Sequence, residues 1–111
     1  MPNEDRKRGA FQALVERVLN GEGRTSAEQR ARAFGNEDLS PPLDTLVGKV
    51  VTGPVRITDA DFAAAKASGF SEDQLFELVI CAAVGQSARL YEAGLAALAQ
   101  ATGGGGSDGA A

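Results

Sequence analysis

The chain has 111 residues, 43% of them apolar and 23% charged, which is typical of one folded domain and excludes a disordered chain. Its net charge of -4 makes the surface a poor match for phosphate groups, so we expect neither nucleic acid nor a membrane as a partner. Cys81 is the only cysteine and histidine is absent, which excludes an intrachain disulfide and the commonest general base.

The N-terminal third of the sequence predicts two helices. Gly21 and Gly23 end the first of them, and Thr25 with Glu28 forms a capping-box pattern at the start of the second. This second helix is short and ends near Gly35. The first helix is predicted from apolar residues at positions i, i+3, i+4, i+7 and i+8, namely Phe11, Leu14, Val15, Val18 and Leu19.

A third helix is expected to start at Ser40, with Pro41 in its first turn. Gly53 and Pro54 end it, and they make residues 51–57 a connector although this segment has some strand character. The third helix repeats the apolar spacing of the first, with Leu43, Leu46, Val47, Val50 and Val51.

Capping boxes introduce the fourth and fifth helices. Thr58 and Asp61 form the first box, and Ser71 and Gln74 form the second. Between them, Gly69 is expected to close the fourth helix in the left-handed conformation. The fifth helix is predicted to continue to about residue 101, a length of roughly 40 Å, which exceeds what a compact domain of this size needs.

The fifth helix is apolar on nearly every side over residues 75–84. Such a helix must be covered all round, by the rest of the domain or by other copies of the chain. The apolar run is too short to cross a bilayer, and no apolar leader opens the sequence, so we expect a cytoplasmic protein. The middle of the helix is rich in small residues, which would allow another helix to approach closely: Ala82, Ala83, Gly85, Ser87 and Ala88.

We therefore predict an all-α protein of about five helices, with one domain over residues 1–102 and a flexible Gly-rich tail over residues 103–111. We expect no cofactor and no metal site. Cys81 lies among apolar residues, which indicates a buried and unreactive thiol. Aspartates near helix starts, such as Asp59 and Asp73, are read as capping or solvated residues.

Four side chains are weak candidates for catalysis: Glu77, Arg56, Arg89 and Tyr91. Glu77 lies inside the apolar run, so its carboxylate needs a partner if it is covered. A structural ion pair with Lys49, Arg56 or Arg89 is favoured over a catalytic role.

The segment from residue 57 to 98 resembles the C-terminal half of the carboxymuconolactone decarboxylase and alkylhydroperoxidase-D-like superfamily. The likeness lies in a helix of small residues that ends at Gly69, the phrase Gly-Phe-Ser-Glu-Asp-Gln, and a long Ala-rich helix. The resemblance implies an alkylhydroperoxidase-D-like helical fold and a homo-oligomer, commonly a trimer or hexamer. The redox members carry Cys-x-x-Cys and a histidine, where this sequence has Pro54, Ile57 and Asp61. We therefore expect no thiol peroxidase activity.

The leading hypothesis is a homo-oligomer without the redox dyad that acts as a binding or structural module. The alternative is a cofactor-independent, carboxymuconolactone-decarboxylase-like enzyme, with the four candidate residues holding a small organic acid at a subunit interface. A third hypothesis makes Cys81 a redox sensor between subunits. The sequence favours a non-enzymatic role.

Overall fold

The computed structural model describes residues 2–104, and it contains helices and no strand within that range. The predicted all-α class and the five helices are confirmed. The α-helices are α1 (Pro2–Asn20), α2 (Ala27–Gly35), α3 (Leu43–Thr52), α4 (Asp59–Ala67) and α5 (Glu72–Ala99). A 3-10 turn, η1 (Pro54–Arg56), follows α3, and a π-helical turn, η2 (Gln100–Gly104), follows α5.

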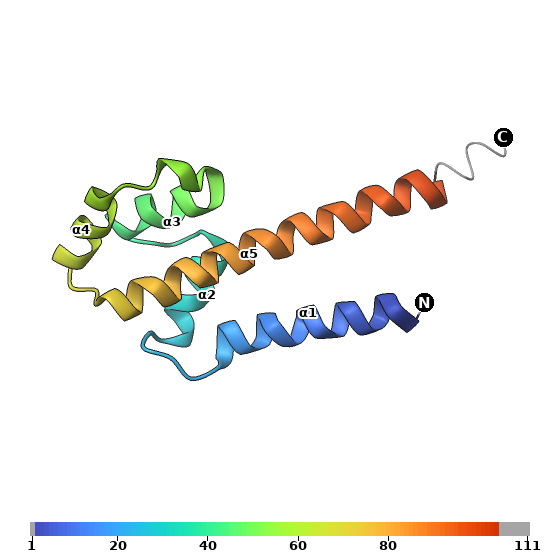
Figure 1. Cartoon of the computed structure of the whole chain (residues 1–111), viewed down its shortest axis with the longest axis horizontal. Helices are drawn as coiled ribbons and strands as arrows, with labels where there is room; N and C mark the ends of the chain where they lie inside the picture. Colours follow the sequence, from blue (N-terminus) through green and yellow to red (C-terminus); the bar gives the residue numbers. More distant parts are fainter. Residues whose placement is uncertain (1, 105–111) are drawn as a thin grey trace.

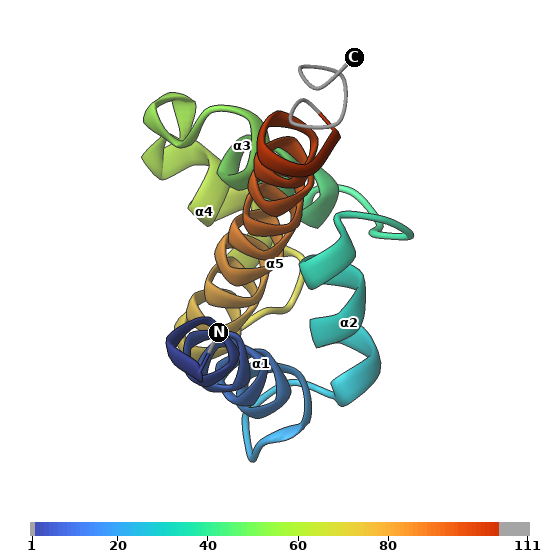
Figure 2. The same ribbon diagram turned by 90° about the vertical axis from the view of Figure 1, so that its right-hand side faces the viewer.

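The molecule is elongated, with extents of 60 × 28 × 21 Å. The helices α3 and α4 gather around the first half of α5, while α1 runs antiparallel to α5 and forms an arm with its second half (Figure 1). The view along the arm shows α2 on the opposite side of α5 from α4 (Figure 2). The second half of α5 therefore has fewer neighbours than the first half.

Two of the predicted helix starts are confirmed in detail. Thr58 and Asp61 bond reciprocally at the start of α4, and Ser71 and Gln74 do so at the start of α5. Gly69 has a φ of +113°, as predicted for the residue that lets the chain leave α4.

The predicted starts of α2 and α3 are wrong. Ser26 and Gln29 form the capping box of α2, one residue after the expected pair of Thr25 and Glu28. Pro42 occupies the cap position of α3, where it has no polar side chain to offer, and Ser40 contributes only its carbonyl oxygen to the backbone N–H of Asp44.

The end of α5 lies close to the predicted position. This helix ends at Ala99, and its helical course continues through η2, so the first two residues of the predicted tail belong to that turn. Residues 105–111 of the tail lie outside the described residues. No helix among residues 2–104 is both long and apolar enough to cross a bilayer.

The core lies between α5 and the helices α2 and α3. The backbone of α2 lies very close to α5 at Gly85, where a Cβ would lie 2.0 Å from the carbonyl oxygen of Phe34. The prediction that small residues of this helix admit another helix is confirmed at Gly85. The buried core residues are Ala33, Leu43, Leu46, Val47, Val50, Ala65, Leu75, Leu78, Cys81 and Ala82.

One side of α5 is exposed in the single chain. A monomer would have to cover this helix on all sides, because its sequence is apolar nearly all round. Phe76 is 66% exposed and Leu90 is 63% exposed. They belong to a row of exposed apolar and small residues spaced alternately by four and three positions, which is the spacing of a coiled-coil seam. We call this row the α5 stripe: Phe76, Ile80, Ala83, Ser87, Leu90, Gly94 and Ala97.

Candidate functional site

Glu77 of α5 holds the loop between α1 and α2. One of its carboxylate oxygens, Oε1, accepts hydrogen bonds from the Thr25 backbone N–H at 3.1 Å and from the Thr25 hydroxyl at 2.9 Å. The other oxygen accepts from the backbone N–H of Arg24. Charge-assisted bonds of this kind fix both partners, so Glu77 determines where the loop lies against α5.

The expected ion-pair partners of Glu77 are wrong. Lys49 Nζ lies 3.0 and 2.9 Å from the two carboxylate oxygens of Asp61. Arg56 donates to Thr52 and Arg89 donates to Phe34, so none of the three cations pairs with Glu77. The Thr25 hydroxyl donates to Glu77, and Ser26, not Thr25, caps α2. The sequence signalled that this carboxylate needed a partner, and the fold supplied hydroxyl and backbone donors.

The hydrogen bonds to Glu77 also determine its charge. Burial alone would raise the pKa of this carboxyl, but the donors from Arg24 and Thr25, with the nearby charge of Arg30, outweigh it and lower the pKa below the ordinary value. Glu77 is therefore ionised at neutral pH.

Arg30 of α2 lies beside Glu77 and is buried, with 7% of its surface exposed. A Cβ at Gly23 would lie 2.4 Å from Arg30 Nη1 and 2.6 Å from Glu77 Oε1, so both side chains press against the same loop residue. Within the described residues, Arg30 Nε has no hydrogen-bond acceptor, and no direct ion pair joins Arg30 to Glu77. Sequence reasoning missed Arg30, whose only signal was its i, i+3 spacing to the buried Ala33.

A small cavity of about 170 Å3 opens between α1, α2 and α5 at this point. Its lining residues are Arg17, Val18, Glu22, Arg30, Glu77, Ile80 and Cys81.

Cys81 is 2% exposed, and its Sγ lies 3.8 Å from the carbonyl oxygen of Val18, to which its S–H is directed. Burial raises the pKa of this thiol, and the nearby Glu77 adds to the increase while Arg30 opposes it. The predicted core placement of Cys81 is confirmed. A buried thiol with a raised pKa forms little thiolate, which makes Cys81 a poor redox sensor between subunits.

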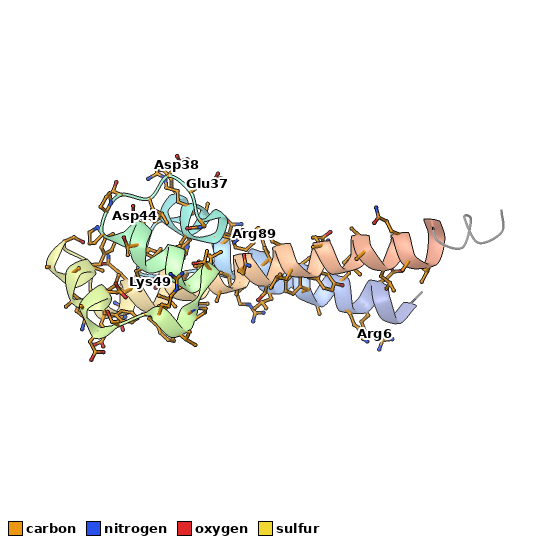
Figure 3. The ribbon with its side chains drawn as sticks, turned by 90° about the horizontal axis from the view of Figure 1, so that it is seen from above. Arg6, Glu37, Asp38, Asp44, Lys49 and Arg89 are labelled. Carbon is orange, nitrogen blue, oxygen red and sulfur yellow. The ribbon has the colours of Figure 1, made fainter. Side chains whose placement is uncertain are left out.

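The other three catalytic candidates each have a separate structural contact. Arg89 Nη1 donates to the carbonyl oxygen of Phe34 at 2.7 Å, where α5 passes the end of α2 (Figure 3). Arg56 Nη2 donates to the Thr52 hydroxyl at 2.8 Å, next to η1. The ring centroids of Tyr91 in α5 and Phe11 in α1 lie 5.1 Å apart. Glu77, Arg89 and Tyr91 thus contact the loop between α1 and α2, α2 and α1, respectively, whereas Arg56 bonds a residue only four positions away.

The positions of the redox motif hold no redox group. Pro54 begins η1, and Ile57 ends that turn. Asp61 accepts from the Thr58 backbone N–H and from Lys49, and these bonds, in that order, lower the pKa of its carboxyl. Among the described residues, no group of three acidic, Cys or His side chains is placed to hold a metal ion.

In comparisons with protein families, curated proteins and solved structures, nothing matches this chain.

A second concave region adjoins the α5 stripe. It is an apolar groove of about 490 Å3 between α4 and α5, and the exposed Phe76 belongs to both its wall and the stripe. Three of its lining residues are charged, Asp59, Lys66 and Glu72, and Lys66 Nζ lies 3.8 Å from Glu72 Oε1. The groove and the stripe thus form one continuous apolar surface. The groove is lined by Asp59, Phe62, Ala63, Lys66, Glu72, Leu75, Phe76 and Val79.

Proposed function

We propose that this protein is a self-associating helical module in which the α5 stripes of several copies pack together. The observation that carries the proposal is the exposed apolar surface of α5, formed by the stripe and the groove beside it. Exposed apolar surfaces of this kind, continuous along an element, are typical of association sites.

The stripe has the chemistry that helix packing requires. Burial of a Phe, Ile or Leu side chain contributes about 1.5–3 kcal/mol, and Phe76, Ile80 and Leu90 would each be buried in every copy. The smaller members of the stripe, such as Ala83 and Gly94, let a neighbouring helix approach between them. Association costs about 4–15 kcal/mol in lost freedom of motion, which a stripe repeated in several copies can offset.

The proposal includes membership of the alkylhydroperoxidase-D-like superfamily without its redox dyad, on the resemblance of residues 57–98. That resemblance makes a trimer or hexamer the expected assembly. The separate contacts of Glu77, Arg56, Arg89 and Tyr91 favour a binding or structural role over cofactor-independent catalysis.

The mass of the assembly in solution tests this function. Light scattering after size exclusion is expected to give about three or six times the 11.4 kDa mass of one chain. Leu90→Glu and Phe76→Glu place a charge in the stripe, and each is expected to shift the assembly to monomers, because a buried unpaired carboxylate is strongly unfavourable.

Val55→Glu is the matched control. Val55 is 96% exposed in η1, away from α5, so this change adds the same charge to the same kind of exposed apolar position and should leave the mass unchanged. A wild-type chain that stays monomeric at micromolar concentration would contradict the proposal, as would Leu90→Glu and Phe76→Glu variants that assemble like the wild type.

A further inference from the structure

We infer that the cavity beside Arg30 binds a small carboxylate anion, with the Arg30 guanidinium as its main ligand-binding group. All residues that line the cavity come from one chain, so this site goes beyond the proposed self-association, and Ile80 is the one residue that belongs to both the cavity wall and the α5 stripe.

Arg30 provides the first step of the argument. A guanidinium carries five N–H donors, and its charge is costly to bury without an acceptor. Arg30 is more than nine-tenths buried, and its Nε lacks an acceptor among the described residues. The neighbouring Glu77 forms no direct ion pair with Arg30, and its oxygens accept from Arg24 and Thr25 instead. An anion in the cavity would offer acceptors to the part of the Arg30 side chain that lines it.

The size and walls of the cavity select the class of ligand. Its volume of about 170 Å3 is well above the roughly 15 Å3 that one water molecule requires. Val18, Ile80 and Cys81 form an apolar wall that suits a short alkyl group. A guanidinium presents two parallel N–H groups, which match the two oxygens of a carboxylate.

The charges around the cavity favour a monoanion. Arg17 adds a second cation from α1, whereas Glu22 and Glu77 add two carboxylates. Beside these two carboxylates, a dianion such as phosphate would meet more repulsion than a carboxylate of the same size. A short aliphatic carboxylate, such as propionate, fits the guanidinium, the apolar wall and the balance of charge.

Propionate is the probe for the first experiment. Titration of the full ¹⁵N-labelled chain at constant ionic strength is expected to give saturable shifts of the amide signals of Val18, Gly23, Thr25 and Cys81, which lie at the cavity or its loop. Propionamide has the same shape without the charge, and sodium chloride supplies a simple anion; neither should give saturable shifts. Equal shifts from chloride or from propionamide would overturn the inference, as would the absence of saturation.

A pair of arginine variants from one helix tests the role of Arg30. Arg30→Gln is expected to weaken propionate binding at least tenfold. Arg32→Gln removes the same charge from an exposed position of α2, where Arg32 pairs with Glu28, and should leave the affinity within twofold of wild type.

Arg17→Gln keeps the test decisive if the Arg30 variant does not fold. Arg17 is exposed, so this variant should fold normally and bind propionate two- to fivefold more weakly. Wild-type affinity in both the Arg30 and the Arg17 variants would show that propionate binds elsewhere.

Discussion

Gly85→Ala is expected to destabilise the protein by about 3 kcal/mol, although alanine is normally the better helix former. The new Cβ would lie 2.0 Å from the carbonyl oxygen of Phe34 and within 3 Å of two further backbone atoms of that residue. Backbone atoms cannot rotate away as a flexible side chain can, so α2 and α5 would have to separate along their contact. Urea unfolding followed by circular dichroism, at one fixed protein concentration, measures the change.

Gly48→Ala is the matched control for this prediction. Gly48 also lies inside a helix, α3, but a Cβ there meets no atom within 4 Å. The same substitution should therefore stabilise the protein by about 0.5–1 kcal/mol, the ordinary gain of alanine over glycine in a helix. If Gly85→Ala also stabilises the protein, or Gly48→Ala also destabilises it, the close contact with Phe34 is not the reason that position 85 disfavours a larger side chain.

Glu77→Ala is expected to lower the free energy of unfolding by about 2 kcal/mol. The variant removes the charged acceptor of three hydrogen bonds and leaves their donors, of which those of Thr25 are partly buried, without a partner. Arg24 and Thr25 supply those donors, so the loop between α1 and α2 should also become less protected against amide hydrogen exchange.

Glu92→Ala removes an exposed carboxylate from the same helix and should change stability by less than about 0.5 kcal/mol. A Glu77→Ala variant as stable as Glu92→Ala, with an equally protected loop, would show that the carboxylate is a dispensable surface charge.

Acidification should reveal the same carboxylate in the wild-type protein. The folded-state pKa of Glu77 lies below its ordinary value of 4.5, so its stabilising effect is complete above pH 4.5 and is lost as the pH falls through the folded-state pKa. Asp61 shifts in the same direction and destabilises wild type and variant alike in acid. The difference in unfolding free energy between wild type and Glu77→Ala should therefore be constant near neutrality and shrink below pH 4.5. A difference that grows in acid would contradict this assignment.

Local signals predicted much of the secondary structure. Thr58 with Asp61 and Ser71 with Gln74 bond across three residues, so their capping boxes need no distant part of the chain. The failures arose where two local patterns competed. Ser26 with Gln29 matches the capping box as well as Thr25 with Glu28 does, and local sequence alone does not choose between overlapping boxes.

Tertiary contacts decided that choice. Glu77 is 52 positions from Thr25 in the sequence, and its carboxylate takes the Thr25 hydroxyl that would otherwise have been free to cap α2. Sequence reasoning recognised that Glu77 needed a partner, but the obvious cations, Lys49 and Arg89, lie against Asp61 and Phe34 in the fold. Which distant residues become partners depends on how the helices cross, and the spacing of apolar residues along the sequence does not give that crossing.

The helices, most of their ends and the apolar character of α5 could be predicted from local patterns, because they depend on residues within a few turns of one another. Which side of α5 is covered depends on contacts between distant parts of the chain. The contact of α2 at Gly85 places the core on one side and leaves the α5 stripe exposed on another. The same packing of α2 against α5 buries Arg30, a charged residue between Gln29 and Ala31, beside the cavity proposed to bind a carboxylate.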